Sequence, residues 1–560
     1  MSIWQSVDLA HWHRMRGVRR YTALALLSAL GISAVGMMGT ALPGWAATQI
    51  YLRYGPLRLS VPVQALENFG KTGDDPRLRF YLKRLAPHQR SQLQNTLNAT
   101  YDVDLMMVSQ FSYTRSGERL LQEVGGLLRT ASGQNGAGSL RSAGILAAAD
   151  PDGFSVLSFL RNLPVDMQID VRQAIAFQRR LGGLLQRTAQ VTNQVIDATQ
   201  AIAQQEASVL QTLPPIDPRQ PGSVAFQQQT LRLVDAQRNR PLTVDLYLPT
   251  VATPAPLIVV SNGLGARRDR FTRLASHLAS HGFAVAIPDH PGSDRDRLQD
   301  FYDGLHRENF DPAEFANRPL DISFLLDALG EMQQQGQFQR IDPERVGAFG
   351  YSFGGTTAFS LAGAEIQLSS LEPACQSDSF ILNISLLYQC QALEAPPPPN
   401  LRDARIKAVY AFLPFGKSLF GTGLSQIDVP VLWEASDEDL LTPLLKEQVP
   451  SFRQLTPSAP QAERYFVLTK GLPHARISYE IAGRTAGRDS GSDRPTTRPS
   501  WEDIKAISER YHHALTLAFF QTHVAGNEDY RPFLTAAYAT QLAEPSFPLG
   551  FVASLDAIED

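Results

Sequence analysis

The feature of this 560-residue chain that most restricts its fold is an alternation of short apolar runs with helical stretches in the C-terminal half. The runs, each bounded by turn residues, read APLIVVSNG, FAVAIPDHPG, RVGAFGYS, IKAVYAFLPF, VPVLWEAS and ERYFVLTKG. Helical stretches such as residues 270–282 and 319–336 separate several of them. Strands that are apolar along their whole length and alternate with helices are typical of a mostly parallel sheet covered on both faces. The pattern therefore predicts an α/β fold, preceded by two strands (residues 224–235 and 240–249) that pair as a hairpin or meander.

A glycine–serine–glycine pattern lies at the end of one of these runs. Ser352 stands between Gly350 and Gly354 in GAFGYSFGG, just before the helical stretch GGTTAFSLAGAE. Such a pattern arises by chance roughly 0.2 times in a chain of this length, so its surroundings decide its meaning. A serine on a sharp strand-to-helix turn is typical of a nucleophile, and the flanking glycines allow the helix to pass close to the strand. We therefore interpret Ser352 as a nucleophile, which needs a base because an alcohol is weakly nucleophilic at neutral pH.

A candidate base and acid follow Ser352 in the chain. Among the 11 histidines, His474 stands just after the last predicted parallel strand, in KGLPHARIS. The acid is expected in PVLWEASDEDLLTP, where Asp439 is preferred because it stands four residues before Pro443, a common spacing in such loops. Glu434, Asp437 and Glu438 remain alternatives for the acid. Asp437 is the main rival of Asp439. The order nucleophile, acid, base is that of α/β-hydrolases.

An oxyanion hole would need two backbone N–H groups directed at the developing negative charge. One is expected at Phe353, directly after the nucleophile. The other is expected at Leu264, between two glycines in SNGLGARRDRF, the loop after the third predicted strand. Loss of one such donor typically costs about 2.7–4 kcal/mol of activation free energy.

The N-terminus has the pattern of an export signal. A basic segment containing Arg19 and Arg20 precedes the apolar run YTALALLSALGISAVGMM, and Gly44 and Ala46 suit the −3 and −1 positions of a cleavage site. The alternative is an uncleaved anchor helix, because the run is just long enough to span a bilayer. We therefore expect an exported protein, periplasmic or extracellular, with residues 1–46 as the signal peptide.

Composition and pattern predict the remaining organisation. Residues 47–211 show apolar residues at three- and four-residue spacing, which favours a mainly helical N-terminal domain. A proline-rich linker (212–223) leads to a catalytic domain (224–545), followed by a C-terminal tail (546–560). The catalytic domain carries an insertion at residues 363–400 and a loop at residues 483–500. We expect the insertion to form part of the wall of an acyl-binding site; the alternative is a structural excursion with no contact to substrate.

The two cysteines lie in this insertion. Cys375 and Cys390 are 15 residues apart in sequence, in CQSDSFILNISLLYQC. In an oxidising compartment the simplest interpretation is one local disulfide, and two buried free thiols are the alternative. Closing a loop of this size would contribute about 3 kcal/mol on the chain-entropy model.

Two segments resemble known families. SNGLGARRDRFTRLASHLASHGFAVAIPDH, together with GYSFGG, resembles the platelet-activating-factor acetylhydrolase family and related dienelactone-hydrolase-like esterases, over about residues 224–480. The N-terminal helical region resembles the domain of unknown function that precedes such hydrolases in cyanobacteria. The resemblance implies an α/β-hydrolase fold and ester hydrolysis through Ser352, Asp439 and His474, with Leu264 and Phe353 as oxyanion donors.

The chain departs from the animal members of that family at two points. Asn262 stands where those enzymes have a histidine before Gly-Leu-Gly. Those enzymes also take their acid from after the strand that here reads VYAFLPF, whereas no carboxylate follows this strand before Asp428.

These observations predict an exported serine hydrolase that cleaves lipid or short-chain carboxylic esters. The alternatives are a lipase, cutinase or polyester hydrolase on the same residues, and a non-catalytic binding module on a hydrolase frame. A net charge of −4 gives no reason to expect a nucleic-acid partner. No cofactor or metal is expected, since no cysteines and histidines are spaced as metal ligands. The expected partner is a small-molecule or lipid ester; membrane-surface association stays open, and no feature indicates an oligomeric state.

Overall fold

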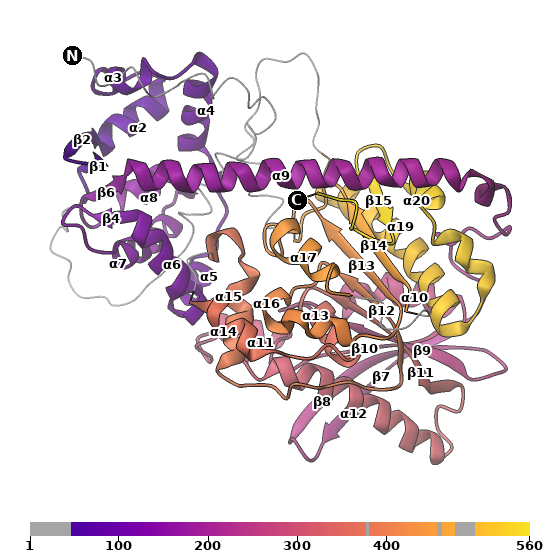
Figure 1. The fold of residues 1–560 in the computed structure, drawn as a ribbon. Coiled ribbons are helices and arrows are strands. Elements are labelled where there is room, and N and C mark those ends of the chain that lie inside the picture. Colours follow the sequence, from indigo (N-terminus) through magenta and orange to yellow (C-terminus); the bar gives the residue numbers. More distant parts are fainter. Residues whose placement is uncertain (1–45, 377–379, 456–461, 476–498, 560) are drawn as a thin grey trace. The chain divides into compact units, whose positions relative to one another are not determined.

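The computed structural model describes residues 46–376, 380–455, 462–475 and 499–559. The chain forms two compact units; the described part of the first ends at Ala189, and the second begins at Gln190 (Figure 1). The predicted signal peptide lies outside the described residues except for Ala46, and the loop 483–500 lies outside them except for its last two residues.

The first unit contains a small sheet that the helical pattern of its sequence did not predict. Its strands are β1 (Gln49–Tyr54), β2 (Leu57–Pro62), β4 (Leu128–Thr130) and β6 (Met167–Asp170). They lie in the order β2-β1-β6-β4, and only the β1–β6 pair is parallel. A two-stranded ladder joins β3 (Thr100–Tyr101) to β5 (Phe154–Ser155). The hairpin between β1 and β2 turns at Gly55, whose φ of 57° is in the region that favours glycine.

Helices make up most of the rest of this unit, as predicted. They are α2 (Val63–Thr72), α3 (Arg79–Leu82), α4 (Pro87–Asn98), α5 (Leu105–Tyr113), α6 (Arg115–Leu127), α7 (Ala137–Ala148) and α8 (Val156–Arg161). Helix α6 buries Leu120, Leu121 and Val124, which recur at three- and four-residue spacing. Its start is fixed by Thr114, whose hydroxyl accepts a hydrogen bond from the N–H of Gly117 at 2.9 Å.

The second unit is built on a mostly parallel sheet. Its strands are β7 (Phe226–Asp235), β8 (Arg240–Pro249), β9 (Ala255–Ser261), β10 (Ala284–Pro288), β11 (Ile341–Tyr351), β12 (Ile406–Phe412), β13 (Val431–Ser436), β14 (Arg464–Thr469) and β15 (Leu549–Val552). The nine strands lie in the order β15-β14-β13-β12-β11-β9-β10-β8-β7. Strands β9 to β14 run parallel, and β7, β8 and β15 pair antiparallel at the two edges. The predicted α/β fold is confirmed, including the β7–β8 hairpin.

Helices cover both faces of this sheet (Figure 1). They are α10 (Thr272–Ser280), α11 (Arg295–Tyr302), α12 (Glu314–Gln334), α13 (Phe353–Leu361), α14 (Leu368–Cys375), α15 (Ser385–Gln389), α16 (Lys417–Phe420), α17 (Val449–Phe452), α19 (Trp501–Phe520) and α20 (Ala536–Leu542). Helix α10 packs against α19, and α12 packs against α13. Helix α12 begins five residues earlier than its apolar pattern indicated, so that Pro319 lies inside it.

The chain changes direction across the sheet between β9 and β11. Strand β10 lies on one side of β9 and β11 on the other, so the loops after β9 and β11 leave neighbouring strand ends in opposite directions. Ligands of open α/β sheets bind at such a switch point, beyond the carboxyl ends of the strands. The fold therefore brings together the loops that follow β9, β11, β13 and β14.

Helix α9 (Val171–Gln205) contains the boundary between the two units. Residues 190–211, which the sequence pattern assigned to the N-terminal domain, belong to the second unit. There the hydroxyl of Thr199 donates to the carbonyl of Phe551 at 3.3 Å and accepts from its N–H at 2.7 Å. Phe551 lies in the edge strand β15, in the segment expected to be a tail, so this end of α9 covers the edge of the sheet.

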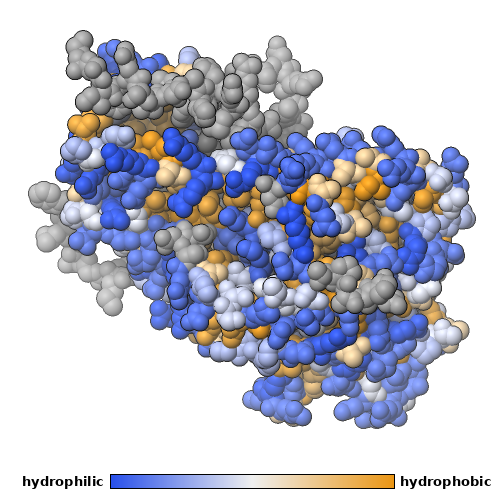
Figure 2. Space-filling view, viewed as in Figure 1, coloured by the Kyte–Doolittle hydropathy of each residue, from blue (hydrophilic) through white to orange (hydrophobic). Residues whose placement is uncertain are grey.

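The surface is polar over most of the face drawn in Figure 2, with hydrophobic residues in smaller groups between hydrophilic ones. A membrane-spanning helix, which needs a long apolar run, does not occur in the part of the chain that the structure describes.

Candidate active site

Ser352 lies on a strained turn between β11 and α13. Its φ of 54° and ψ of −117° are unusual for a residue with a side chain. A Cβ on Gly350 would lie 2.1 Å from the carbonyl oxygen of Gly354, and one on Gly354 would lie 1.8 Å from that of Ser261. Both glycines are therefore required for the close approach of helix and strand, and the turn presents Ser352 at the carboxyl end of the sheet.

His474 links Ser352 to a buried carboxylate. Its Nε2 lies 3.0 Å from the Ser352 Oγ, and its Nδ1 lies 2.6 Å from Oδ2 of Asp439. Because a carboxylate only accepts, the His474 proton belongs on Nδ1, which leaves Nε2 free to accept from the serine hydroxyl. The hydroxyl of Tyr351 donates to the carbonyl of His474 at 2.6 Å and so fixes the His474 loop against the end of β11.

Asp439 is held by four donors. Its Oδ1 accepts the N–H groups of Leu441 and Thr442, each at 2.8 Å, and its Oδ2 accepts the Thr442 hydroxyl besides His474. Burial alone would raise the pKa of Asp439, but the charge of His474 and these hydrogen bonds outweigh it and hold the pKa below its usual value. The carboxylate therefore stays ionised and can stabilise a protonated His474.

The rival carboxylates have other partners. Glu434 accepts the hydroxyls of Tyr410 and Thr469, at 2.7 and 2.9 Å. Asp437 accepts the N–H of Gly471 at 2.7 Å, and burial raises its pKa. Of the carboxylates considered from the sequence, the structure brings Asp439 to His474.

The loop after β9 lies against Ser352. A Cβ on Gly263 would lie 3.3 Å from that of Ser352, and Gly265 has a φ of 68°. Leu264 lies between these glycines, and Phe353 is the first residue of α13, where helix N–H groups have no intrahelical partner. Among the described residues, the N–H groups of Leu264 and Phe353 donate to no acceptor. Both are thus available to a ligand oxygen next to Ser352.

The predicted insertion is helical and packs beside this site. Cys375 and Cys390 form a disulfide with their Cα atoms 5.7 Å apart. The N–H of Ser385 donates to the carbonyl of Leu441, in the loop that carries the acid, at 2.9 Å. Tyr388 contacts the ring of Phe310, with 6.0 Å between centroids, and Phe310 contacts that of Phe353 at 5.6 Å. The insertion is thereby connected to the loop that carries Asp439 and, through Phe310, to Phe353.

Several supporting residues had no sequence signal. Tyr351 and the buried Arg318 donate to backbone carbonyls of distant segments, which follow no local pattern. Thr442 donates its hydroxyl to Asp439, three residues earlier, a contact that its sequence position alone did not reveal. No three His, Cys, Asp or Glu side chains are grouped to hold a metal ion in the described ranges.

Comparison with known proteins agrees with this architecture. Residues 46–170 match a family model described as "Alpha/beta hydrolase of unknown function (DUF1400)", and residues 256–369 match one described as "alpha/beta hydrolase fold". The chain is also similar to the quorum-quenching protein AidA of Acinetobacter baumannii (strain MDR-ZJ06), with 28% identity over 144 residues. That match covers 25% of this chain and 42% of the relative, so the chain spans less than half of the relative's length.

The second matched segment runs from β9 through the Ser352 turn to the beginning of α14, and so contains the switch point of the sheet. Together with the strand order and the helices on both faces, these matches support an α/β-hydrolase fold for the second unit.

Proposed function

We propose that the chain is a serine esterase that hydrolyses carboxylic esters through an acyl-Ser352 intermediate. The observation that carries this proposal is the unbroken contact from the Ser352 Oγ to His474 and on to the buried Asp439, at 3.0 and 2.6 Å. The two unpaired N–H groups beside the serine support it further, since an acyl transfer needs them at the developing oxyanion.

In the first half of the reaction Ser352 attacks the ester carbonyl. A bond forms from Oγ to the carbonyl carbon while the serine proton passes to Nε2 of His474. The carbonyl oxygen becomes an oxyanion, which the N–H groups of Leu264 and Phe353 stabilise. The bond to the leaving alkoxide then breaks, His474 returns the proton to that oxygen, and an alcohol departs.

In the second half water replaces the alcohol. His474 removes a proton from the water as its oxygen bonds to the acyl carbon, and the same two N–H groups hold the second oxyanion. The bond to Oγ breaks, the serine regains its proton from His474, and a carboxylic acid leaves. Asp439 keeps its charge throughout and favours the imidazolium that forms in each half.

We propose lipid esters or short-chain acyl esters as the substrate class, with the insertion as a wall of the acyl site. The contact of Ser385 with the acid loop and the ring contact of Tyr388 with Phe310 support this wall, because both lie next to the reacting residues. Export is part of the proposal, supported by the N-terminal pattern and by the disulfide. A lipase, cutinase or polyester hydrolase would use the same residues on a longer or polymeric ester.

A fluorophosphonate probe and an ester series test the proposal together. The probe should label the wild-type chain at Ser352 and leave Ser352→Ala unlabelled, with unchanged thermal unfolding as the control for folding. A series of p-nitrophenyl esters from acetate to palmitate would report the preferred acyl length. A glycerophosphocholine lipid with an acetyl group at the second glycerol carbon would test a lipid substrate. Labelling that persists in Ser352→Ala would show that another residue is the nucleophile. A folded wild type that neither reacts with the probe nor hydrolyses the esters would indicate a non-catalytic binding module.

A further inference from the structure

A second serine–histidine–aspartate array lies behind the candidate active site. The Ser261 hydroxyl is 3.0 Å from Nε2 of His290, whose Nδ1 is 3.0 Å from Oδ2 of Asp321. All three side chains are at most 2% exposed, so no substrate reaches this serine. Ser261 ends β9 and directly precedes the loop that carries Leu264. We therefore interpret this array as a structural contact that holds the end of β9, from which the Leu264 loop starts.

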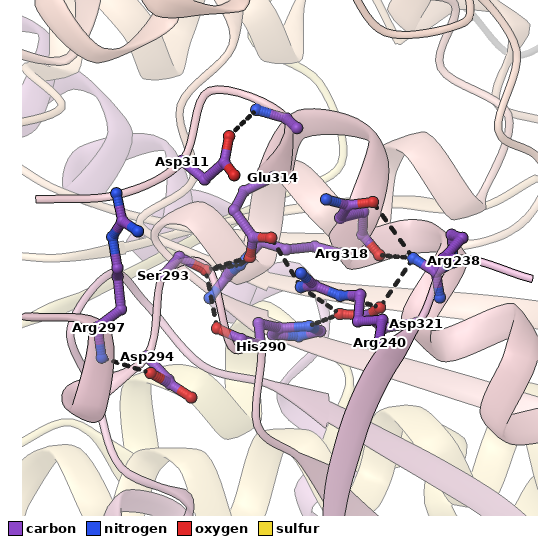
Figure 3. Close-up of polar contacts among 12 residues, drawn as sticks. Arg238, Arg240, His290, Ser293, Asp294, Arg297, Asp311, Glu314, Arg318 and Asp321 are labelled. Atoms are coloured by element: carbon purple, nitrogen blue, oxygen red, sulfur yellow. Dashed lines mark hydrogen bonds and ion pairs between the residues drawn. The ribbon is translucent and has the colours of Figure 1, made fainter. Parts of the chain in front are cut away.

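Arg318 of α12 lies close to Ser293 and Glu314 (Figure 3) and also contacts the loop. The side chain is 1% exposed. Its Nη2 donates to the carbonyl of Asn262 at 2.8 Å, and its Nε donates to the hydroxyl of Ser293 at 2.9 Å. Burial lowers the pKa of Arg318 to about 10, so it remains charged at neutral pH.

The same guanidinium reaches both segments that carry the proposed oxyanion donors. On the loop side, Asn262 and Gly265 flank Leu264: Arg318 binds the carbonyl of Asn262, and the backbone carbonyl of Ser293 accepts the N–H of Gly265 at 2.8 Å. On the helix side, the guanidinium carbon lies 4.5 Å from the centroid of the Phe353 ring. A shift of Arg318 would therefore alter the placement of both donors.

Charge neutralisation alone does not account for this geometry. Glu314 lies 3.9 Å from Arg318, yet its shorter contacts, 2.7 and 2.6 Å, are with Arg240 and Ser293. Arg240 also forms a two-pronged contact with Asp321, at 2.7 and 2.8 Å (Figure 3). Buried ion pairs contribute little net stability, and apolar residues of similar size often replace them without loss. What Arg318 supplies beyond charge is the directed bond to the Asn262 carbonyl.

We propose that Arg318 is a positioning residue that sets the oxyanion loop, by holding the Asn262 carbonyl so that the Leu264 N–H faces the reacting carbonyl. The inference rests on the proposed function, because the oxyanion forms only if Ser352 attacks an ester. A lysine keeps the charge but has neither the planar fork nor the second directed donor. Arg318→Lys should therefore disturb the transition state more than substrate binding.

The test compares Arg318→Lys with Arg240→Lys as a matched control. Arg240 contacts Glu314, as Arg318 does, and also contacts Asp321, but within the described part of the chain it has no hydrogen bond or ion pair to the loop or to Phe353. With p-nitrophenyl acetate, Arg318→Lys should lower kcat about 10- to 100-fold and leave KM within about threefold. Inhibition by an aryl trifluoromethyl ketone, whose adduct carries an oxyanion, should weaken by the same factor. Arg240→Lys should keep kcat within about threefold.

Ser293→Ala covers the case in which Arg318→Lys does not fold. It removes the hydroxyl that holds the Arg318 Nε and leaves the charges unchanged. The expected result is a three- to tenfold lower kcat at constant KM, on the order of the loss for a slightly misplaced donor. Equal losses in the Arg318 and Arg240 variants, or full kcat in a folded Arg318→Lys or Ser293→Ala, would overturn the inference. Failure of the wild type to label at Ser352 would instead overturn the proposed function.

Discussion

Replacement of Asp439 by asparagine changes one oxygen to an NH₂ group and keeps the shape of the side chain. Every group that faces this carboxylate is a donor: two backbone N–H groups at Oδ1, and the Thr442 hydroxyl and His474 Nδ1 at Oδ2. The two backbone donors cannot rotate, so the amide oxygen must stay with them. The amide nitrogen then takes the place of Oδ2 and points its hydrogens at His474.

His474 can meet an amide donor only with a lone pair on Nδ1. Its proton then moves to Nε2, the nitrogen that lies 3.0 Å from the Ser352 Oγ. A protonated Nε2 cannot accept the serine proton, so the imidazole is held in the wrong tautomer for a base. In serine proteases the equivalent change lowers kcat about 10⁴-fold, which corresponds to about 5 kcal/mol of activation free energy. We expect a loss of that size here, with KM nearly unchanged because the buried Asp439 touches no substrate.

The assay is p-nitrophenyl acetate hydrolysis together with the rate of fluorophosphonate labelling, and both should fall by the same factor. Asp437→Asn is the matched control. Asp437 accepts one N–H, that of Gly471, and an amide oxygen can do the same, so this variant should lose less than about tenfold. Thermal unfolding of both variants checks that the fold persists. An Asp439→Asn enzyme within tenfold of the wild type, or a larger loss in Asp437→Asn, would refute the tautomer argument and move the acid to Asp437.

Three further changes probe the oxyanion loop, the buried network and the acyl wall. In Gly263→Ala the new Cβ would lie 2.9 Å from the Tyr351 ring, so the loop must shift by several tenths of an ångström; kcat should fall about 10- to 100-fold, and an unchanged kcat would separate the loop from catalysis. Burial, and then the charge of Arg318, lower the pKa of His290 from 6.5 to about 4, so the unfolded chain binds more protons than the native chain between these pH values. His290 should therefore contribute a fall of up to roughly 3 kcal/mol in the free energy of unfolding as the pH drops from about 6.5 to 4, beside the contributions of His277 and His523, whose pKa values burial also lowers. His290→Gln should reduce the slope by that share in urea titrations, and an unaltered slope would contradict the assignment. Tyr388→Ala should change the ratio of long-chain to acetate kcat/KM about tenfold, whereas an equal loss for every ester would limit the insertion to a structural role.

The parallel sheet could be predicted from the sequence because its central strands are buried on both faces. Runs such as Leu257–Val260 in β9 and Tyr465–Leu468 in β14 are apolar throughout, and this signal needs no knowledge of their neighbours. Residues at the ends of such strands meet at one edge of the sheet, and the structure brings Ser352, Asp439 and His474 together there.

Other features escaped because their signal is not local. Strand β15 has only four residues, and what makes it a strand is its pairing with β14, which lies about 80 residues earlier in the chain. The strands of the four-stranded N-terminal sheet have three to six residues and lie between strong helical patterns. Arg318 binds a backbone carbonyl 56 residues away, a contact that any residue type could offer at that position. Asp437, Glu438 and Asp439 are consecutive in one loop, and backbone geometry decides which of them faces His474.

The contact of Thr199 with Phe551 affects where the chain can be shortened. An uncovered edge strand offers its free N–H and C=O groups to other chains and invites aggregation. A protein shortened to begin after the proline-rich stretch 212–223 would keep every residue of the candidate site, yet it would lose the hydroxyl that accepts the N–H of Phe551 and shares its proton between the carbonyls of Val195 and Phe551. We expect such a protein to associate through β15 and one that begins before Gln190 to stay dispersed, so the smallest well-behaved form of the second unit is longer than its candidate site requires.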